Sequence, residues 1–150
     1  MEQQLDDKDW KILTLLQEHA EYTNRQIAKK LCLPITTVYN RIKRMRQEDV
    51  IEKFTIKINH NKTGRNFAAY VLIIVNLELL KAKKKTQSDL IADIRKFYFV
   101  ERVDIVSGMT DLIVLVRVSD VNEFDSILRS KLQLIEGVER TQSMIIIHSE

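Results

Sequence analysis

In the first fifty residues, apolar side chains recur every three or four positions, which is the spacing of one face of a helix. The first such face consists of Leu5, Ile12, Leu13 and Leu16, and Asp9, a favourable first-turn residue, falls on the same face. Asp6 can cap the start of this helix, which we expect to end near Glu18. Thr23, followed three residues later by Gln26, is the signature of a capping box and predicts a second, short helix that runs to about Lys30.

A third helix is predicted from Pro34, because proline is favoured in the first turn of a helix. Its buried stripe consists of Val38, Ile42 and Met45. Two short helices joined by a tight turn, the second polar and basic on its outside, are typical of a helix-turn-helix. A plain three-helix bundle with a solvated face is the alternative. Cys32 lies in the apolar turn and is expected to be a small core residue.

After Val50 the apolar period changes from helical spacing to alternation, which predicts a strand or a two-stranded wing up to Ile58. A polar stretch without apolar side chains follows at 59–66. We therefore divide the chain into a helix-turn-helix domain at 1–58, a linker at 59–66 and a second domain at 67–150.

The second domain alternates between strand-like and helix-like patterns in the order βαββαβ. The expected strands are 67–80, 100–107, 111–118 and 138–148, and the expected helices are 87–97 and 121–132. This order predicts an α+β fold of the ferredoxin-like type, with both helices on one face of the sheet.

Several of these strands are apolar on both faces, notably 69–75, 112–116 and 144–147. Strands with continuous apolar runs are typically buried on two sides, yet the helices cover only one. A bare apolar sheet face is rare in soluble monomers. We therefore expect a second copy of the chain to cover it, which predicts a homodimer.

The composition is that of an ordinary globular protein: 150 residues, 45% hydrophobic and 30% charged, with a net charge of +3. No apolar stretch has the length of a membrane span, and the first residues lack the pattern of a signal peptide, so we expect a cytoplasmic protein without a membrane partner. The single cysteine excludes an internal disulfide and a multi-cysteine zinc site. The basic run Lys81–Lys85 is interpreted as a solvated loop.

The sequence offers no support for an enzyme. There is no glycine-rich phosphate loop, no pair of catalytic carboxylates and no nucleophile elbow. His19, His60 and His148 lie far apart and lack metal-ligand spacing. We expect neither a cofactor nor a metal.

From about Leu5 to Ile147 the chain resembles the Lrp/AsnC family, the feast/famine regulators of bacteria and archaea. The segments that carry the resemblance are Leu5-Asp6 with Ile12-Leu13, Ile27-Ala28 with Leu31, Thr37–Ile42 with Val50-Ile51, Gly64, Gly108–Asp111, and Gly137-Val138 with Thr141. Their order and spacing together are specific, although no single segment is diagnostic.

The resemblance implies an N-terminal DNA-binding domain and a C-terminal domain that dimerises and binds an amino acid, with assembly into tetramers or octamers. Three positions depart from the family pattern. Pro34 replaces a polar cap before the third helix. Asp49 stands where glycine is favoured, and we expect a left-handed conformation there. Thr110 stands where an aromatic residue is frequent, which leaves the identity of the effector open.

Double-stranded DNA is the expected partner of the third helix, because the start of a recognition helix enters the major groove. The candidates for contacts with base edges are Ile35, Thr36, Thr37, Tyr39, Asn40 and Lys43. Arg44 and Arg46 are expected to contact phosphates. Arg41 either contacts DNA or pairs with an acidic residue of the first helix.

A candidate effector site lies in the turn formed by Ser107, Gly108, Met109, Thr110 and Asp111. Its backbone N–H groups could bind a carboxylate and its terminal aspartate an ammonium group, and these two charges define a free amino acid. The alternative is a tight hairpin turn without a ligand.

Together these features predict a sequence-specific transcription regulator that acts as a dimer or larger oligomer. Two alternatives remain: a DNA-organising protein with weak sequence preference and no effector, and a metabolic sensor that uses only the ligand domain.

Overall fold

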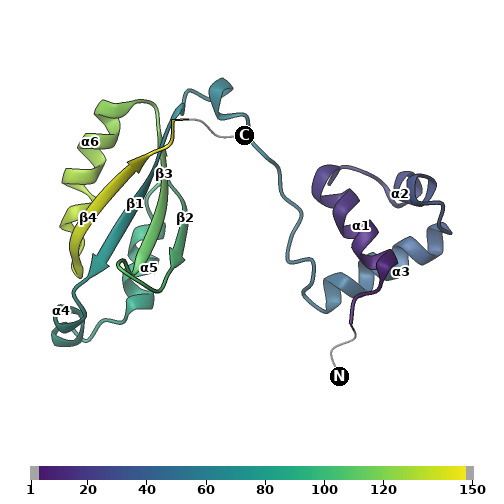
Figure 1. The fold of residues 1–150 in the computed structure, drawn as a ribbon, viewed down its shortest axis with the longest axis horizontal. Helices are drawn as coiled ribbons and strands as arrows, with labels where there is room; N and C mark the ends of the chain where they lie inside the picture. The colour runs from purple at the N-terminus through teal and green to yellow at the C-terminus, as the bar shows by residue number, and fades with distance from the viewer. Residues whose placement is uncertain (1–3, 148–150) are drawn as a thin grey trace. The chain divides into compact units, whose positions relative to one another are not determined.

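The computed structural model describes residues 4–147, which form two compact units that meet along the chain between Ile58 and Asn59 (Figure 1). Within the described range, none of the helices has the length and apolar character that crossing a bilayer requires.

The N-terminal unit consists of the three predicted helices, α1 (Asp7–Glu18), α2 (Asn24–Leu31) and α3 (Ile35–Gln47). Asp6 caps α1 and Thr23 caps α2, each in a capping box in which the third helical residue returns a hydrogen bond to the cap. The core consists of Ile12, Leu16, Ile27, Ala28, Val38 and Met45. These local signals therefore placed the helices correctly.

Two turns of this unit contain left-handed residues. Asp49 has φ 55°, as its glycine-like position predicted. Cys32 ends α2 with φ 52°, and its side chain is exposed, so the expectation of a core cysteine was wrong. The left-handed backbone that terminates the helix turns the residue away from the core, whatever its hydropathy.

The predicted wing is absent: residues 50–58 form no strand. Ile51 donates its N–H to the Met45 carbonyl at 3.0 Å and packs against the core, but the chain then runs extended with Phe54, Ile56 and Ile58 exposed. A strand needs a partner for its N–H and C=O groups, and the described part of this unit is otherwise helical. The alternation of apolar and polar residues was therefore not sufficient to form a strand here.

The C-terminal unit confirms the predicted α+β fold. Its strands are β1 (Phe67–Val75), β2 (Val100–Ile105), β3 (Leu112–Val118) and β4 (Val138–Ile145). Its helices are α4 (Leu77–Ala82), α5 (Gln87–Arg95) and α6 (Val121–Ser130), with short 3-10 turns at His60–Lys62 and Leu132–Leu134. The sheet is antiparallel with the order β2-β3-β1-β4.

The first strand is shorter than the predicted 67–80. It stops at Val75 because Asn76 accepts a hydrogen bond from the Leu79 N–H and starts α4. The last strand was expected to reach His148 but ends at Ile145, and His148 itself lies outside the described residues.

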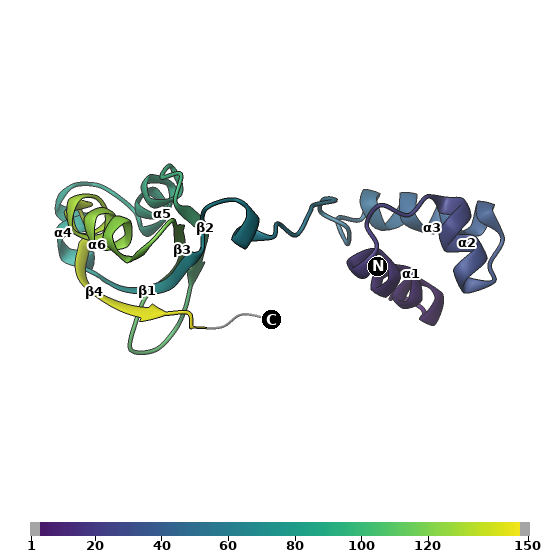
Figure 2. The same ribbon diagram turned by 90° about the horizontal axis from the view of Figure 1, so that it is seen from above.

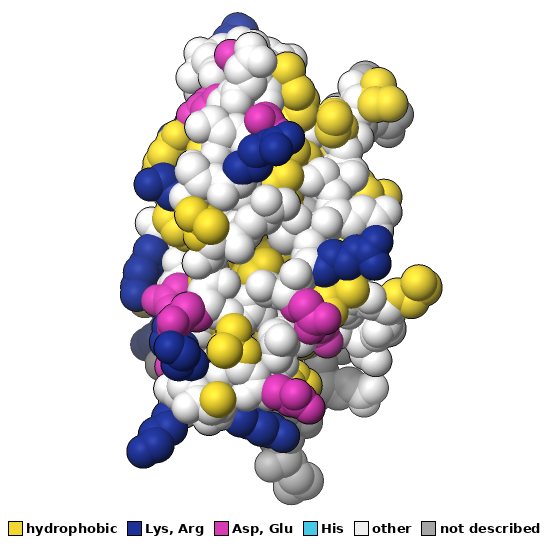
Figure 3. Space-filling view, turned by 90° about the vertical axis from the view of Figure 1, so that its left-hand side faces the viewer, with side chains coloured by type: hydrophobic (Ala, Val, Ile, Leu, Met, Phe, Trp, Pro, Cys, Tyr) yellow, Lys and Arg dark blue, Asp and Glu magenta, His cyan; other side chains and the backbone are white. Residues whose placement is uncertain are grey.

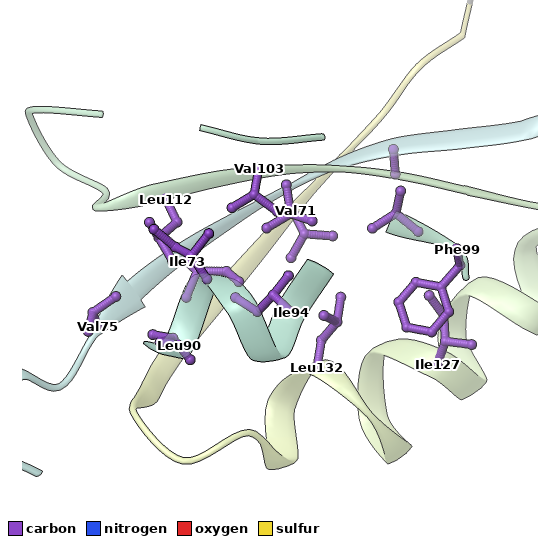
Figure 4. Packing of buried hydrophobic residues seen from close by; sticks show 14 of the residues in the cluster. Val71, Ile73, Val75, Leu90, Ile94, Phe99, Val103, Leu112, Ile127 and Leu132 are labelled. Carbon is purple, nitrogen blue, oxygen red and sulfur yellow. The ribbon is translucent and has the colours of Figure 1, made fainter. Parts of the chain in front are cut away.

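Helices α5 and α6 lie together on one side of the sheet (Figure 2). Figure 4 shows the core that they enclose, in which Val71 and Ile73 of β1 point toward Ile94 and Leu132. Phe99 and Ile127 extend this core beside α6. The predicted placement of both helices on one face is therefore confirmed.

The opposite side of the sheet is what we call the open sheet face. The residue pairs of the strands place six large apolar side chains on it, namely Tyr70, Leu72, Ile74, Ile113, Leu115 and Met144. All six are partly or fully exposed in the single chain, and Met144 is 54% exposed. The two central strands β3 and β1 and the edge strand β4 thus contribute to one apolar surface.

Candidate DNA interface and effector turn

The outer surface of α3 carries most of the predicted DNA-binding residues. Val38 and Met45 are fully buried against α1 and α2, which fixes the opposite side of α3 outward. The candidates that are exposed there are Ile35, Thr36, Tyr39, Asn40, Lys43 and Arg46. Thr37 is half-buried.

A groove of about 420 Å³ runs along this surface. Its lining consists of Asn24, Tyr39, Ile42, Lys43, Arg46 and Gln47. Asn24 belongs to the first turn of α2, where backbone N–H groups favour an anion. Because Lys43 and Arg46 lie beside the start of α2, this groove is suited to bind the phosphate backbone of DNA. Asn24 was not among the predicted DNA-binding residues, and its only signal in the sequence is its place directly after the Thr23 cap.

Arg41 is not oriented toward this groove. Its Nη1 atom donates to both carboxylate oxygens of Asp6, at 2.7 and 2.8 Å, and to Oδ1 of Asp9 at 2.8 Å. The structure thus realises the pairing with the first helix that the sequence offered as one of two roles.

Arg44 also turns toward α1. Its Nη2 donates to Oδ2 of Asp9 at 2.5 Å, and its Nε lies 3.7 Å from a Glu48 oxygen. Its predicted role as a phosphate contact does not fit this geometry, since the guanidinium already neutralises a carboxylate that is only 1% exposed. The sequence did contain a signal for this pair, because Asp9 falls on the apolar face of α1.

The charge state of this cluster is set by its hydrogen bonds. The Asp9 N–H, followed by the Arg41 guanidinium, lowers the pKa of Asp6 from 3.8 to about 2. The same carboxylates raise the pKa of Arg41 above its ordinary value. Asp6 and Arg41 therefore stay charged throughout the neutral range.

The second basic run, Lys81–Lys85, is not a free cationic patch. Lys83 and Lys85 both lie 3.3 Å from Glu136, and Lys85 also pairs with Asp93. On the face of the molecule in Figure 3, basic and acidic side chains lie among one another. The run includes the end of α4 as well as the expected loop.

The predicted effector turn is fastened to the end of β1. Asp111 donates its N–H to the Ile73 carbonyl at 3.0 Å and accepts the Val75 N–H on Oδ2 at 2.8 Å. The Thr110 hydroxyl donates to the Ile73 carbonyl at 2.9 Å. These hydrogen bonds are the ones expected of a tight hairpin turn without a ligand, which was the alternative interpretation of this segment. Of the two carboxylate oxygens of Asp111, Oδ2 is used in this way and Oδ1 has no hydrogen-bond partner among the described residues.

The tip of this turn is open. Ser107 and Gly108 are exposed, with φ 143° at Gly108, and Met109 is 98% exposed. The five predicted residues are therefore contiguous, but in the single chain they form a loop and not an enclosed site. A ligand at this turn would need a second surface to cover it.

Polar side chains bind the segment before β1 to the C-terminal unit. His60 Nε2 lies 3.4 Å from Glu101, and Arg65 donates to the Tyr98 carbonyl and lies over the Tyr98 ring. The Tyr98 hydroxyl in turn donates to Glu123 at 2.5 Å. Residues 59–66, predicted as a linker, are thus held by side-chain contacts to this unit.

Comparison with protein families gives two matches. The winged helix-turn-helix DNA-binding family matches residues 5–52, and the Lrp/AsnC ligand binding domain matches residues 72–150. Together they cover the α3 surface, the effector turn and the residues of the open sheet face from Leu72 onward.

Whole-chain relatives agree with these matches. An uncharacterized HTH-type transcriptional regulator from Pyrococcus furiosus is 37% identical over 145 residues, covering 97% of this chain and 94% of the relative. The feast or famine regulatory protein from M. tuberculosis, solved in complex with L-methionine, has a TM-score of 0.83 at 25% identity, with 97% of this chain and 94% of that chain covered. A Neisseria meningitidis transcriptional regulator in complex with L-Met shares the fold, with a TM-score of 0.86 at 22% identity over 97% of this chain and 91% of that chain.

Proposed function

We propose that this chain, which belongs to the Lrp/AsnC family of DNA-binding transcription regulators, recognises specific DNA sequences as a dimer through α3. Members of this family have a ligand-binding C-terminal domain and are not enzymes. The observation that carries the proposal is the arrangement of α3, whose apolar side is buried while its polar side, with Lys43 and Arg46, is exposed. We also propose a cytoplasmic location, because the proposed partner is DNA.

The base-reading residues are those on the outer surface near the start of α3. Asn40 is suited to adenine and Lys43 to guanine, and each good contact discriminates between bases by about 1–3 kcal/mol. Thr36 and Tyr39 flank them on the same exposed side.

The open sheet face supports the dimer. Tyr70 pairs with Leu115 on one side and with Met144 on the other, so the apolar side chains are contiguous across three strands. A second copy of the same face would bury them symmetrically. A dimer would carry two recognition helices and read half-sites about 34–36 Å apart, or a multiple of this spacing. Tetramers or octamers would follow from further contacts between dimers.

The effector turn supports a role for a free amino acid. Asp111 retains one carboxylate oxygen without a partner among the described residues, and Gly108 leaves its backbone accessible. L-methionine is the first candidate, because the similar M. tuberculosis protein was solved in complex with L-methionine. The ligand would be held between this turn and a second subunit, which would also explain why the single chain has no enclosed site there.

Selection of bound sequences from random DNA, with and without a mixture of the twenty amino acids, tests the DNA-binding proposal. We expect a palindromic motif that Lys43→Ala abolishes. Uniform coating of DNA without a motif would favour the DNA-organising alternative, and no binding even at low salt would favour a ligand sensor.

The dimer has its own test on β4, where adjacent residues face opposite sides of the sheet. Met144 lies on the open sheet face and Ser143 on the other side, and both are exposed in the single chain. Met144→Glu should shift the sedimentation coefficient to that of a monomer, whereas the control Ser143→Glu should leave it unchanged. Equal behaviour of the two variants would contradict the proposed interface.

The effector is tested by thermal shift with each amino acid. A ligand at 100 times its Kd adds about 2.7 kcal/mol to stability. Asp111→Asn should remove the shift for the amino acid that gives one. No shift at millimolar concentration would point to a regulator without an effector.

A further inference from the structure

The four basic side chains of α3 fall into two groups. Arg41 and Arg44 are partly buried, with side chains 21% and 28% exposed, and both are bonded to α1. Lys43 and Arg46 are exposed, and neither makes an ion pair within residues 4–147. Of the four positive charges on α3, only those of Lys43 and Arg46 are therefore available to contact DNA.

Helical geometry separates the groups further. At 3.6 residues per turn, the midpoint of Arg41 and Arg44 lies roughly 160° around the helix axis from the midpoint of Lys43 and Arg46. The buried side chains of Val38 and Met45 lie between them. The two groups therefore occupy opposite flanks of α3.

Asp9 explains why the first group is turned inward. Its carboxylate is 1% exposed, and both oxygens are used: Oδ1 accepts from Arg41, and Oδ2 accepts from Arg44 and from the Asp6 N–H at 3.1 Å. A buried carboxylate is costly unless it is paired. Moving either arginine to a DNA phosphate would remove a partner from this carboxylate.

We infer that Asp9 is a positioning residue that holds Arg41 and Arg44 away from DNA and fixes the rotation of α3, so that Lys43 and Arg46 are the cations of this helix that face DNA, Arg46 toward phosphates and Lys43 within reach of both a base and the adjoining phosphate. The inference rests on the proposed function, since it assigns roles within the same DNA interface. It replaces the predicted phosphate contact of Arg44 with a contact inside the protein.

The salt dependence of DNA binding distinguishes the two roles, because each phosphate contact that is lost lowers the slope of log K against log salt by about 0.9. The duplex is the one recovered by sequence selection. Arg46→Gln and Arg44→Gln form a matched pair on the same helix. We expect Arg46→Gln to reduce the slope by about 0.9 per subunit, and Arg44→Gln to leave it unchanged even where the affinity falls. A purely structural defect would lower the affinity without changing the slope.

A second pair repeats the test one turn earlier, with Lys43→Gln expected to reduce the slope and Arg41→Gln expected to preserve it. If Arg44→Gln does not fold, the double variant Asp9→Asn/Arg44→Gln replaces the ion pair with a neutral hydrogen-bonding pair and should keep the wild-type slope. Equal loss of slope in Arg44→Gln and Arg46→Gln would overturn the inference while leaving the proposed function intact. An unchanged slope in all four single variants would overturn the contact of α3 with DNA itself.

Discussion

The two units of this protein solve the problem of holding helices in place by different means. The C-terminal unit packs α5 and α6 on a sheet through a large, wholly apolar core that includes Val71, Ile94 and Phe99. The N-terminal unit has a much smaller apolar core and adds a buried carboxylate, Asp9, to it.

The difference follows from what each unit presents to its surroundings. A recognition helix must keep most of its circumference polar and exposed, so α3 contributes only Val38 and Met45 as fully buried side chains. Apolar packing on so narrow a stripe leaves the rotation of a helix weakly defined. The bonds from Asp9 to Arg41 and Arg44 supply directional contacts at two successive turns. In the C-terminal unit the sheet register already defines the orientation.

The largest predicted effect tests this dependence on charge. Asp9→Ala leaves two guanidinium groups without their buried partner and should lower the stability of the N-terminal unit by about 3–5 kcal/mol. Hydrogen exchange measured on peptides from each unit should show faster exchange throughout α1, α2 and α3 and little change in the sheet. The control is Asp7→Ala, an exposed residue of the same helix, for which we expect a change within about 0.5 kcal/mol. Similar exchange in both variants would mean that the apolar core alone holds the helices.

In the C-terminal unit the corresponding weak point is a close contact. A Cβ atom at Gly137 would lie 2.4 Å from Cδ2 of Leu80, and φ there is +98°. Gly137→Ala should therefore cost about 2–4 kcal/mol, from overpacking and from the left-handed backbone. Gly64→Ala separates the two causes, because φ is +74° but no atom lies within 4 Å of the new Cβ. We expect a midpoint in urea that falls clearly less for Gly64→Ala; equal shifts would exclude the contact with Leu80 as a cause.

Both units also contain the same local device, a threonine capping box, at Thr23 in the N-terminal unit and at Thr86 in the C-terminal unit. Thr→Ala at either cap should cost about 1 kcal/mol. The smaller N-terminal core makes the loss at Thr23 a larger share of the stability of its unit. Hydrogen exchange of individual peptides, measured during thermal denaturation, should show that α2 unfolds at a lower temperature in Thr23→Ala than α5 does in Thr86→Ala. Serine at either position should restore most of the lost stability.

Local signals predicted much of this architecture. The capping residues Asp6 and Thr23 and the helical spacing of apolar residues gave α1 and α2 nearly to the residue, and the strand patterns gave the order of the sheet. The errors arose where a single capping contact or a single backbone conformation decided the outcome. Asn76 ended β1 within an apolar run, and Cys32 turned outward with a left-handed backbone.

The candidate DNA site shows the same limit. Composition predicted four basic residues on α3, but the loss of Arg41 and Arg44 to α1 depends on contacts across 32 to 35 positions of the chain. Spacing within one helix does not reveal such pairs. The one available hint was the charge of Asp9 on an apolar face, which sequence patterns interpret equally well as a favourable first-turn residue.

The smallest expected effect compares the acid sensitivity of the two units. Asp6 in the N-terminal unit and Glu123 in the C-terminal unit both have their pKa lowered to about 2, from 3.8 and 4.5. For Asp6 the main cause is the Asp9 N–H and for Glu123 it is the Tyr98 hydroxyl. Because folding lowers both pKa values, each carboxylate stabilises its unit fully above its unfolded pKa, and this stabilisation is lost as the pH falls from about 4 to about 2.

Neutral variants isolate each contribution. Asp6→Asn keeps a capping side chain and Glu123→Gln keeps an acceptor for the Ser119 N–H. Each should flatten the decline of stability between pH 4 and pH 2 in its own unit only, as measured by urea unfolding resolved by hydrogen exchange. Asp6 is exposed and Glu123 is partly exposed, so solvent screens both and the changes should be small beside that of Asp9→Ala. If Asp6→Asn also flattened the loss of stability of the C-terminal unit at low pH, the two units would unfold together. The contrast between a unit held by charged contacts and a unit held by apolar packing would then be wrong.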